Sequence, residues 1–203
     1  VSDPKSVGAM VKDIEATETQ VDVLINNAAT KTKNLDDFFE PFETFTLKTW
    51  LEVNSINLDG MFLVAQAIGN HMIKNGTRGS IVQISSIYGV NAPDQRIYEG
   101  SEYNGRPINT PAVYSVSKAG VIALSNYLAA YWGDKGLRIN TISPGGVFSG
   151  QNTEFVDRYS ERVPMRRMGS AQELTGALLL LASDKSSYMT GQNMVIDGGL
   201  TIW

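Results

Sequence analysis

The sequence predicts an α/β fold in which a doubly wound parallel sheet is covered by helices on both faces. Two observations support this prediction. Short apolar runs typical of buried strands alternate with longer segments of helical periodicity along all 203 residues. No internal repeat, linker or low-complexity segment divides the chain, and its length favours one domain over two. Ligands of such open sheets bind beyond the carboxyl ends of the strands, so we expect the functional residues there.

The first half of the chain contains two predicted helices and two predicted strands. Asp3 can cap a helix that begins at Pro4, after which apolar residues repeat at helical spacing. A buried strand at residues 21–25 ends in two asparagines. A long helical pattern then covers residues 46–74, and a second strand covers residues 80–84.

The second half begins with an irregular stretch at residues 88–110, which contains several Gly, Pro and aromatic residues. A loop of this length inside a compact domain is usually functional or disordered. Because it leaves a strand at its carboxyl end, we expect it to cover a substrate rather than to be a mere surface excursion. The elements that follow are a central helix in residues 111–135, a strand at 137–142, helices at 154–162 and 171–182, and a strand at 193–196.

Composition excludes several classes of function. A net charge of -4, a pI near 5.0 and scattered Lys and Arg provide no basic surface for nucleic acid. No apolar run reaches the roughly 18 residues of a membrane span. The chain has no Cys, which fits a reducing cytoplasm, and its single His71 lies at a polar helix end where we expect it to be solvated. We therefore expect a cytoplasmic protein with a small-molecule ligand, and we assign no metal, nucleic-acid or membrane partner.

The pair Tyr114 and Lys118 is the first candidate for chemistry. The two residues stand four positions apart in the central helix and therefore share one of its faces. A positive charge about 5 Å from the phenol, at an effective dielectric constant near 20, contributes roughly 3 kcal/mol and lowers the Tyr pKa by roughly two units. Such a phenol can exchange a proton near neutral pH. This spacing also occurs by chance in many helices, so it needs support from the surrounding chain.

That support comes from the strand ends, which a parallel sheet brings to one edge. Asn26 to Ala29 follow the first strand, Ser85 and Ser86 follow the second, and Pro144 to Val147 follow the third. Small residues at strand ends let a flat ligand approach the backbone. Each segment alone is more often an ordinary turn or helix cap.

In this order, the segments resemble the short-chain dehydrogenase/reductase family over essentially the whole chain. Residues 23–29 are similar to its Asn-Asn-Ala-Gly segment, with Ala29 in place of Gly, and residues 50–62 resemble the helix of its catalytic Asn. Residues 79–89 match the strand of its catalytic Ser, and residues 189–199 resemble its closing strand. The resemblance implies a single Rossmann-like oxidoreductase domain over residues 1–203.

The resemblance also implies four catalytic residues. Tyr114 would donate a proton to a carbonyl oxygen, or take one from an alcohol, while Ser86 would hydrogen-bond the same oxygen. Lys118 would lower the Tyr pKa and bind the nicotinamide ribose. Asn57 would hold a water that links Lys118 to solvent; alternatively, its amide bonds backbone across a kink in its helix.

By the same resemblance the cofactor is NAD or NADP. The residues that it implies for cofactor binding are Asn27, Ala28, Ala29, Tyr114, Lys118, Pro144, Gly145, Val147 and Ser149, the last at a position where Thr is commoner.

Two departures from the family's pattern lead to expectations about the substrate and about the length of the chain. The gap between Ser86 and Tyr114 is longer than usual, and residues 95–100 in it resemble branches that act on sugars or surface polysaccharides, which suggests a hydroxyl-rich substrate. The family's first strand and Gly-rich turn are not found. We therefore expect a C-terminal portion of a longer chain, with roughly 60 preceding residues and with an apolar sheet edge left exposed.

The predicted function is thus an NAD(P)-dependent oxidoreductase that interconverts a secondary alcohol and a ketone by hydride transfer, on a sugar-like or polyol-like substrate. A non-catalytic dinucleotide-binding regulator or scaffold on the same fold, or a simple interaction module, are the alternatives. The central helix is apolar nearly all round, which predicts a buried helix on both sides. Together with the resemblance, which adds residues 171–182, this predicts a homodimer or homotetramer.

Overall fold

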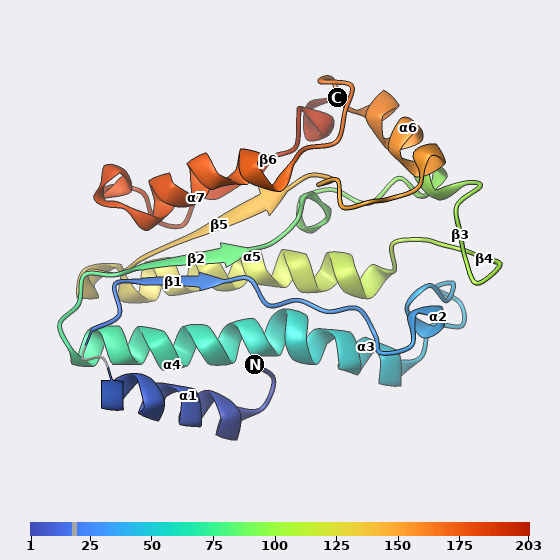
Figure 1. Cartoon of the computed structure of the whole chain (residues 1–203). Helices are drawn as coiled ribbons and strands as arrows, with labels where there is room; N and C mark the ends of the chain where they lie inside the picture. Colours follow the sequence, from blue (N-terminus) through green and yellow to red (C-terminus); the bar gives the residue numbers. More distant parts are fainter. Residues whose placement is uncertain (18–19) are drawn as a thin grey trace.

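The four short apolar runs of the sequence form one parallel sheet in the computed structural model, which describes residues 1–17 and 20–203 (Figure 1). Its strands lie in the order β1-β2-β5-β6. All neighbouring strands are parallel, with Leu24 opposite Ile81 and Ile81 opposite Ile139. The predicted α/β architecture is confirmed. The strands are β1 (Val23–Asn26), β2 (Ser80–Ile84), β5 (Arg138–Pro144) and β6 (Asn193–Ile196).

Helices cover both faces of this sheet, as the alternation of elements predicts. Figure 1 shows α1 (Pro4–Thr17) and α4 (Met61–Lys74) on one side and α7 (Thr175–Ala182) on the other. Consecutive residues of β2 separate the two layers: Ile81 packs with α4 and α5 (Ala112–Trp132), whereas Val82 packs with α7. This is the period of two that a strand buried on both faces requires.

The helical pattern at residues 46–74 consists of three segments rather than one. α3 (Leu47–Asn54) is followed by a π-helical turn, η1 (Ser55–Gly60), and then by α4. A π turn inserts one extra residue into a helix without ending it, so the helical pattern continues beyond the turn with its apolar face shifted by one residue. Asn57, one of the predicted site residues, lies within this turn and is buried.

The stretch 88–110 has more local structure than the sequence predicts. It contains the end of the 3-10 turn η2 (Ile87–Gly89), the turn η3 (Gln95–Tyr98) and a small antiparallel hairpin of β3 (Glu102–Tyr103) and β4 (Arg106–Pro107). Asn104 and Gly105 have φ of 51 and 71°, the left-handed conformation that a tight hairpin turn needs. Asp94 binds Arg96 and also Arg162 of α6 (Thr153–Arg162), which fastens the stretch to the C-terminal part of the chain.

Several short elements were not predicted because they lack a periodic signal. α2 (Leu35–Phe38) begins at Asn34, whose side chain caps the helix by accepting from the Asp36 amide. The predicted helix at 171–182 is the 3-10 turn η5 (Ala171–Leu174) followed by α7. The remaining 3-10 turns are η4 (Gly133–Lys135), η6 (Asp184–Ser186) and η7 (Leu200–Ile202).

The prediction that His71 is solvated is wrong. The side chain is not solvated; the residue is only 4% exposed, and its Nδ1 lies 3.7 Å from Glu15 Oε1. The reason is tertiary, because α1 packs across α4 and covers the polar end of that helix.

β1 is one of the two edge strands of the sheet, and its Val23 and Ile25 side chains are exposed. This agrees with the expected apolar edge. Within the described residues, no helix is long and apolar enough to cross a bilayer.

Candidate active site

The loops that follow β1, β2 and β5 emerge at the same edge of the sheet, because the three strands are parallel. In Figure 1 this edge is on the right, on the side of α2, α6 and the β3–β4 hairpin. The predicted segments at residues 27–29, 85–86 and 144–147 therefore converge, as expected from their strand-end positions.

Lys118 joins the end of β2 to α5. Its ammonium donates to the Ile84 carbonyl over 3.1 Å, and its own carbonyl accepts from Ser85 Oγ over 2.7 Å. The residue is only 3% exposed, and this burial lowers the pKa of the Lys118 side chain to about 8. The ammonium is thus held by a main-chain carbonyl at the end of β2.

Tyr114 stands one turn earlier on the same helix, facing a pocket that it shares with Ser86. Burial raises the pKa of the Tyr114 phenol, and interaction with the Ser86 hydroxyl opposes that rise. The predicted lowering of this pKa is therefore wrong for the structure. Burial outweighs the nearby positive charge, because the Lys118 ammonium binds the Ile84 carbonyl and its Nζ lies 5.8 Å from the centre of the Tyr114 ring.

Asn57 is fully buried, and both the nitrogen and the oxygen of its side-chain amide form hydrogen bonds with the backbone of Thr30. Its Nδ2 donates to the Thr30 carbonyl over 3.0 Å, and its Oδ1 accepts from the Thr30 amide over 2.7 Å. The partner is in the loop after β1, not across a kink in the same helix. Asn57 therefore fixes the segment that carries Asn27, Ala28 and Ala29 to the π turn.

The loop after β5 presents backbone rather than side chains to the site. The Gly145 amide donates to the Ile196 carbonyl over 2.8 Å, and the Gly146 amide donates to the Tyr159 hydroxyl. A Cβ atom on Gly146 would stand 2.6 Å from the Tyr159 ring, so only glycine fits. Pro144, at the end of β5, leads into this loop.

Beyond the glycines, the same loop is tied by its own side chains and by a short bridge. Val147 pairs with Gly169. Gln151 donates to the Val147 carbonyl over 3.1 Å and accepts from the Ser149 amide over 2.7 Å. Ser149 itself is exposed at the rim.

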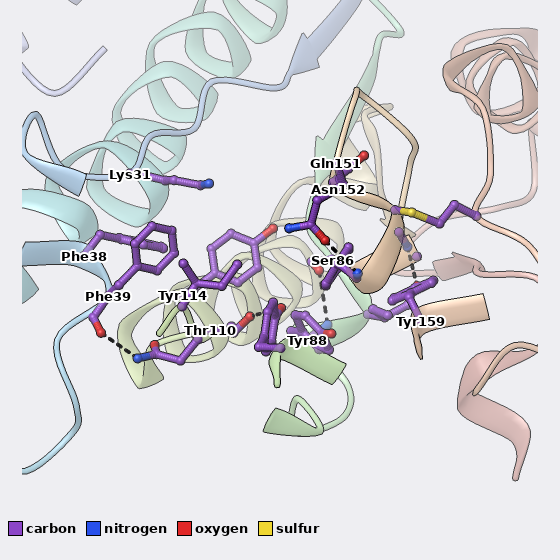
Figure 2. A pocket seen from close by; sticks show the side chains of 18 residues that line it. Lys31, Phe38, Phe39, Ser86, Tyr88, Thr110, Tyr114, Gln151, Asn152 and Tyr159 are labelled. Atoms are coloured by element: carbon purple, nitrogen blue, oxygen red, sulfur yellow. Dashed lines mark hydrogen bonds between the residues drawn. The ribbon is translucent and has the colours of Figure 1, made fainter. Parts of the chain in front are cut away.

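A cavity of about 420 Å³ lies at this edge (Figure 2). Of the predicted site residues, Ser86, Tyr114 and Gly145 line it. The other predicted site residues are not among its lining residues; they are Asn27, Ala28, Ala29, Asn57, Lys118, Pro144, Val147 and Ser149.

The sequence missed most of the cavity's other lining residues. Figure 2 shows that they come from the loop after β1, from α2, from the stretch 88–110 and from α6. Their only signal in the sequence is that they follow strand ends at a distance, which does not say which side chains turn inward. Among them are Lys31, Phe38, Phe39, Tyr88, Asn152 and Tyr159.

Comparisons with known proteins agree with this geometry. A family model described as enoyl-(acyl carrier protein) reductase matches residues 1–201. Gluconate 5-dehydrogenase of Gluconobacter oxydans is 35% identical over 209 residues, which are 100% of this chain and 73% of that protein. The ribulose-forming D-arabinitol 2-dehydrogenase of Candida tropicalis is 34% identical over 214 residues, with 100% and 68% covered.

A solved structure is similar over the same range. It is a short-chain dehydrogenase from Leptospira borgpetersenii with bound NAD+, which is 38% identical and superimposes with a TM-score of 0.88. The match covers 98% of this chain and 72% of that one.

Proposed function

The chain belongs to the short-chain dehydrogenase/reductase family, and from this premise we propose how its residues carry out the reaction. The protein is an NAD(P)-dependent oxidoreductase that interconverts a secondary alcohol and a ketone. One observation carries the proposal: the Tyr114 and Ser86 side chains line one cavity, and the buried ammonium of Lys118 lies 5.8 Å from the centre of the Tyr114 ring.

Each group then has a distinct task. Tyr114 transfers the proton to or from the substrate oxygen, and Ser86 holds that oxygen by a hydrogen bond. Lys118 supplies positive charge behind the phenol, which stabilises its ionised form once a ligand displaces water. Asn57 acts as a positioning residue, because its amide is committed to the Thr30 backbone.

The residues at the rim fit a flat dinucleotide end. Gly145 and Gly146 offer bare backbone, because a Cβ atom there would collide with Asp197 or Tyr159. Ala28 and Ala29, in the loop after β1, also have small side chains that leave room for a flat ligand. When bound, the nicotinamide ring supplies or accepts the hydride. Asn27, Val147 and Ser149 would hold the cofactor from the two loops, and Lys118 would reach its ribose hydroxyls.

We propose a sugar-like or polyol-like substrate. The relatives that act on gluconate and D-arabinitol support this class. The cavity supports it as well, because Thr110, Gln151 and Asn152 add neutral hydrogen-bonding groups to its lining. Residues 88–110 contribute part of the wall, which supports their proposed role as a cover; the contributors are Tyr88, Tyr98, Ile108, Asn109 and Thr110.

We also propose a homodimer or homotetramer. α5 carries a row of exposed apolar residues at helical spacing, and α3 and α4 add further exposed apolar residues beside it. A row of this kind on packed helices is typical of a subunit interface. Its members are Leu47, Leu51, Phe62, Val116, Ala119, Ala123, Tyr127 and Tyr131. Cytoplasmic location stays a prediction.

Tyr114→Phe tests the catalytic assignment. We expect turnover of polyols with NAD or NADP to fall by at least about 100-fold, because the proton donor is lost. The dissociation constant for NADH or NADPH, measured by fluorescence titration, should change less than about twofold. The matched control is Tyr188→Phe, an exposed tyrosine outside the cavity and outside this row. Retained turnover in the Tyr114 variant would refute the assignment.

A further inference from the structure

We propose that Lys31 binds a carboxylate of the substrate, so that the site prefers a polyhydroxy acid to the neutral polyol of equal length. This inference rests on the proposed sugar-like substrate class and narrows it to anionic members.

Lys31 is the one charged residue among those that line the active-site cavity; the other seventeen are neutral, within the part of the chain that the structure describes. No acidic side chain in residues 1–17 and 20–203 forms an ion pair with it. A cavity with one unbalanced positive charge attracts anions and rejects cations.

The surroundings of the Lys31 ammonium are aromatic rather than acidic. Nζ lies 5.5 Å from the centre of the Phe39 ring and 5.8 Å from that of Phe38. The rings hold the flexible side chain over the cavity by cation–π attraction. No residue in the described part of the chain accepts a hydrogen bond from this ammonium, so its three hydrogens can donate to an oxyanion.

The position of Lys31 in the pocket indicates which part of the substrate it binds. In Figure 2 Lys31, Phe38 and Phe39 lie at one end of the pocket, Tyr159 lies at the other, and Tyr114 lies between them. Tyr159 marks the glycine loop, since its hydroxyl accepts from the Gly146 amide. The anionic group therefore lies on the far side of Tyr114 from that loop, at a carbon other than the one that reacts.

The test compares acids with neutral polyols in three proteins. We would measure kcat and KM, with NAD and with NADP, for aldonates of four to six carbons and for the alditols of the same length. The parent should prefer the aldonates. Lys31→Met should lower kcat/KM for aldonates by about 10- to 100-fold, mainly through KM, and leave alditols within about twofold, because only the acids lose a charged partner. Lys31→Arg should keep the preference.

Lys33→Met is the matched control, because Lys33 is exposed two residues further along the same loop and does not line the cavity. It should leave both substrate classes unchanged. Equal losses for acids and alditols in Lys31→Met, or no loss for either, would overturn the role of Lys31 while leaving the proposed function intact.

Binding supplies an arm that does not depend on turnover. With NAD present, an aldonate should raise the melting temperature of the parent more than the alditol does, and Lys31→Met should abolish that difference. If the parent oxidises neither class, the proposed substrate class fails. If, in addition, aldonate and alditol shift the melting temperature equally, the carboxylate site fails as well.

Discussion

Burial of the Lys118 ammonium lowers the stability of the folded protein. An ammonium that is 3% exposed, with one carbonyl as its hydrogen-bond partner, loses more hydration than it regains, and its pKa falls from 10.5 to about 8. A shift of this size corresponds to roughly 3 kcal/mol of lost stability when the group is charged. A residue retained at that cost is typical of a functional site.

Lys118→Met should therefore stabilise the protein while removing activity. Below about pH 8 the lysine is protonated in both the folded and the unfolded state, so the folded protein bears the whole penalty. Between about pH 8 and 10.5 only the unfolded chain stays protonated, and the penalty declines as the pH rises. We expect a gain of about 1–2 kcal/mol at pH 7, after the lost bond to the Ile84 carbonyl, shrinking towards pH 10.

Urea unfolding of parent and variant at several pH values measures this difference. Lys12→Met, an exposed lysine on α1, is the control and should show no such pH dependence. A Lys118 variant that is less stable than the parent at pH 7 would show that the ammonium stabilises the fold, contrary to the argument from burial.

At the scale of elements, the contact between the turn η2 and α5 sets the distance between Ser86 and Lys118. Gly89 ends this turn, and a Cβ atom there would lie 2.7 Å from the main-chain carbon of Lys118 and 2.8 Å from its oxygen. Backbone cannot yield as a side chain can. Gly89→Ala should therefore cost about 2 kcal/mol and separate the two catalytic segments.

We expect the activity of Gly89→Ala to fall more than its folded fraction does, because a small misplacement of reacting groups lowers the rate strongly. Thermal unfolding and kcat on the folded fraction measure the two effects separately. Gly8→Ala is the control: a Cβ atom at this helical glycine would meet nothing within 4 Å, so the change should be neutral or stabilise α1 by about 0.5–1 kcal/mol. Full activity in Gly89→Ala would mean that the turn does not position Ser86.

Part of the site could be predicted from the sequence, and part could not. Parallel strands and their shared edge follow from apolar runs and strand-end residues, so the meeting of Ser86, Tyr114 and Gly145 was predictable. The hydrogen-bond partner of Asn57 was not predictable, because it is the Thr30 backbone, which carries no side-chain signal in the sequence. The Tyr114 pKa was missed because burial is a property of the packed site, not of a spacing. Lys31 was missed because nothing in a loop sequence tells which lysine turns inward.

At the scale of the whole molecule, the exposed apolar residues are not spread evenly. On α5 they recur at Val116, Ala119, Ala123 and Tyr127, three or four residues apart, so they form one stripe on the outer side of the helix. The inner side of the same helix, with Val121 and the residues around it, packs on the sheet. A second copy of the chain that laid its α5 against this stripe would bury both faces of the helix.

Ala123→Glu tests this assembly, because Ala123 lies in the middle of the stripe and a small side chain there lets two helices approach closely. In an interface between identical copies the same carboxylate enters from both subunits, where burial and like-charge repulsion both oppose association. We expect the parent to sediment as a dimer or tetramer and Ala123→Glu to dissociate at least about 100-fold more readily in analytical ultracentrifugation. Ala16→Glu, the same change at an exposed alanine of α1, should leave the parent's assembly intact. Circular dichroism should show both variants folded, and an unaltered oligomer in Ala123→Glu would place the interface elsewhere.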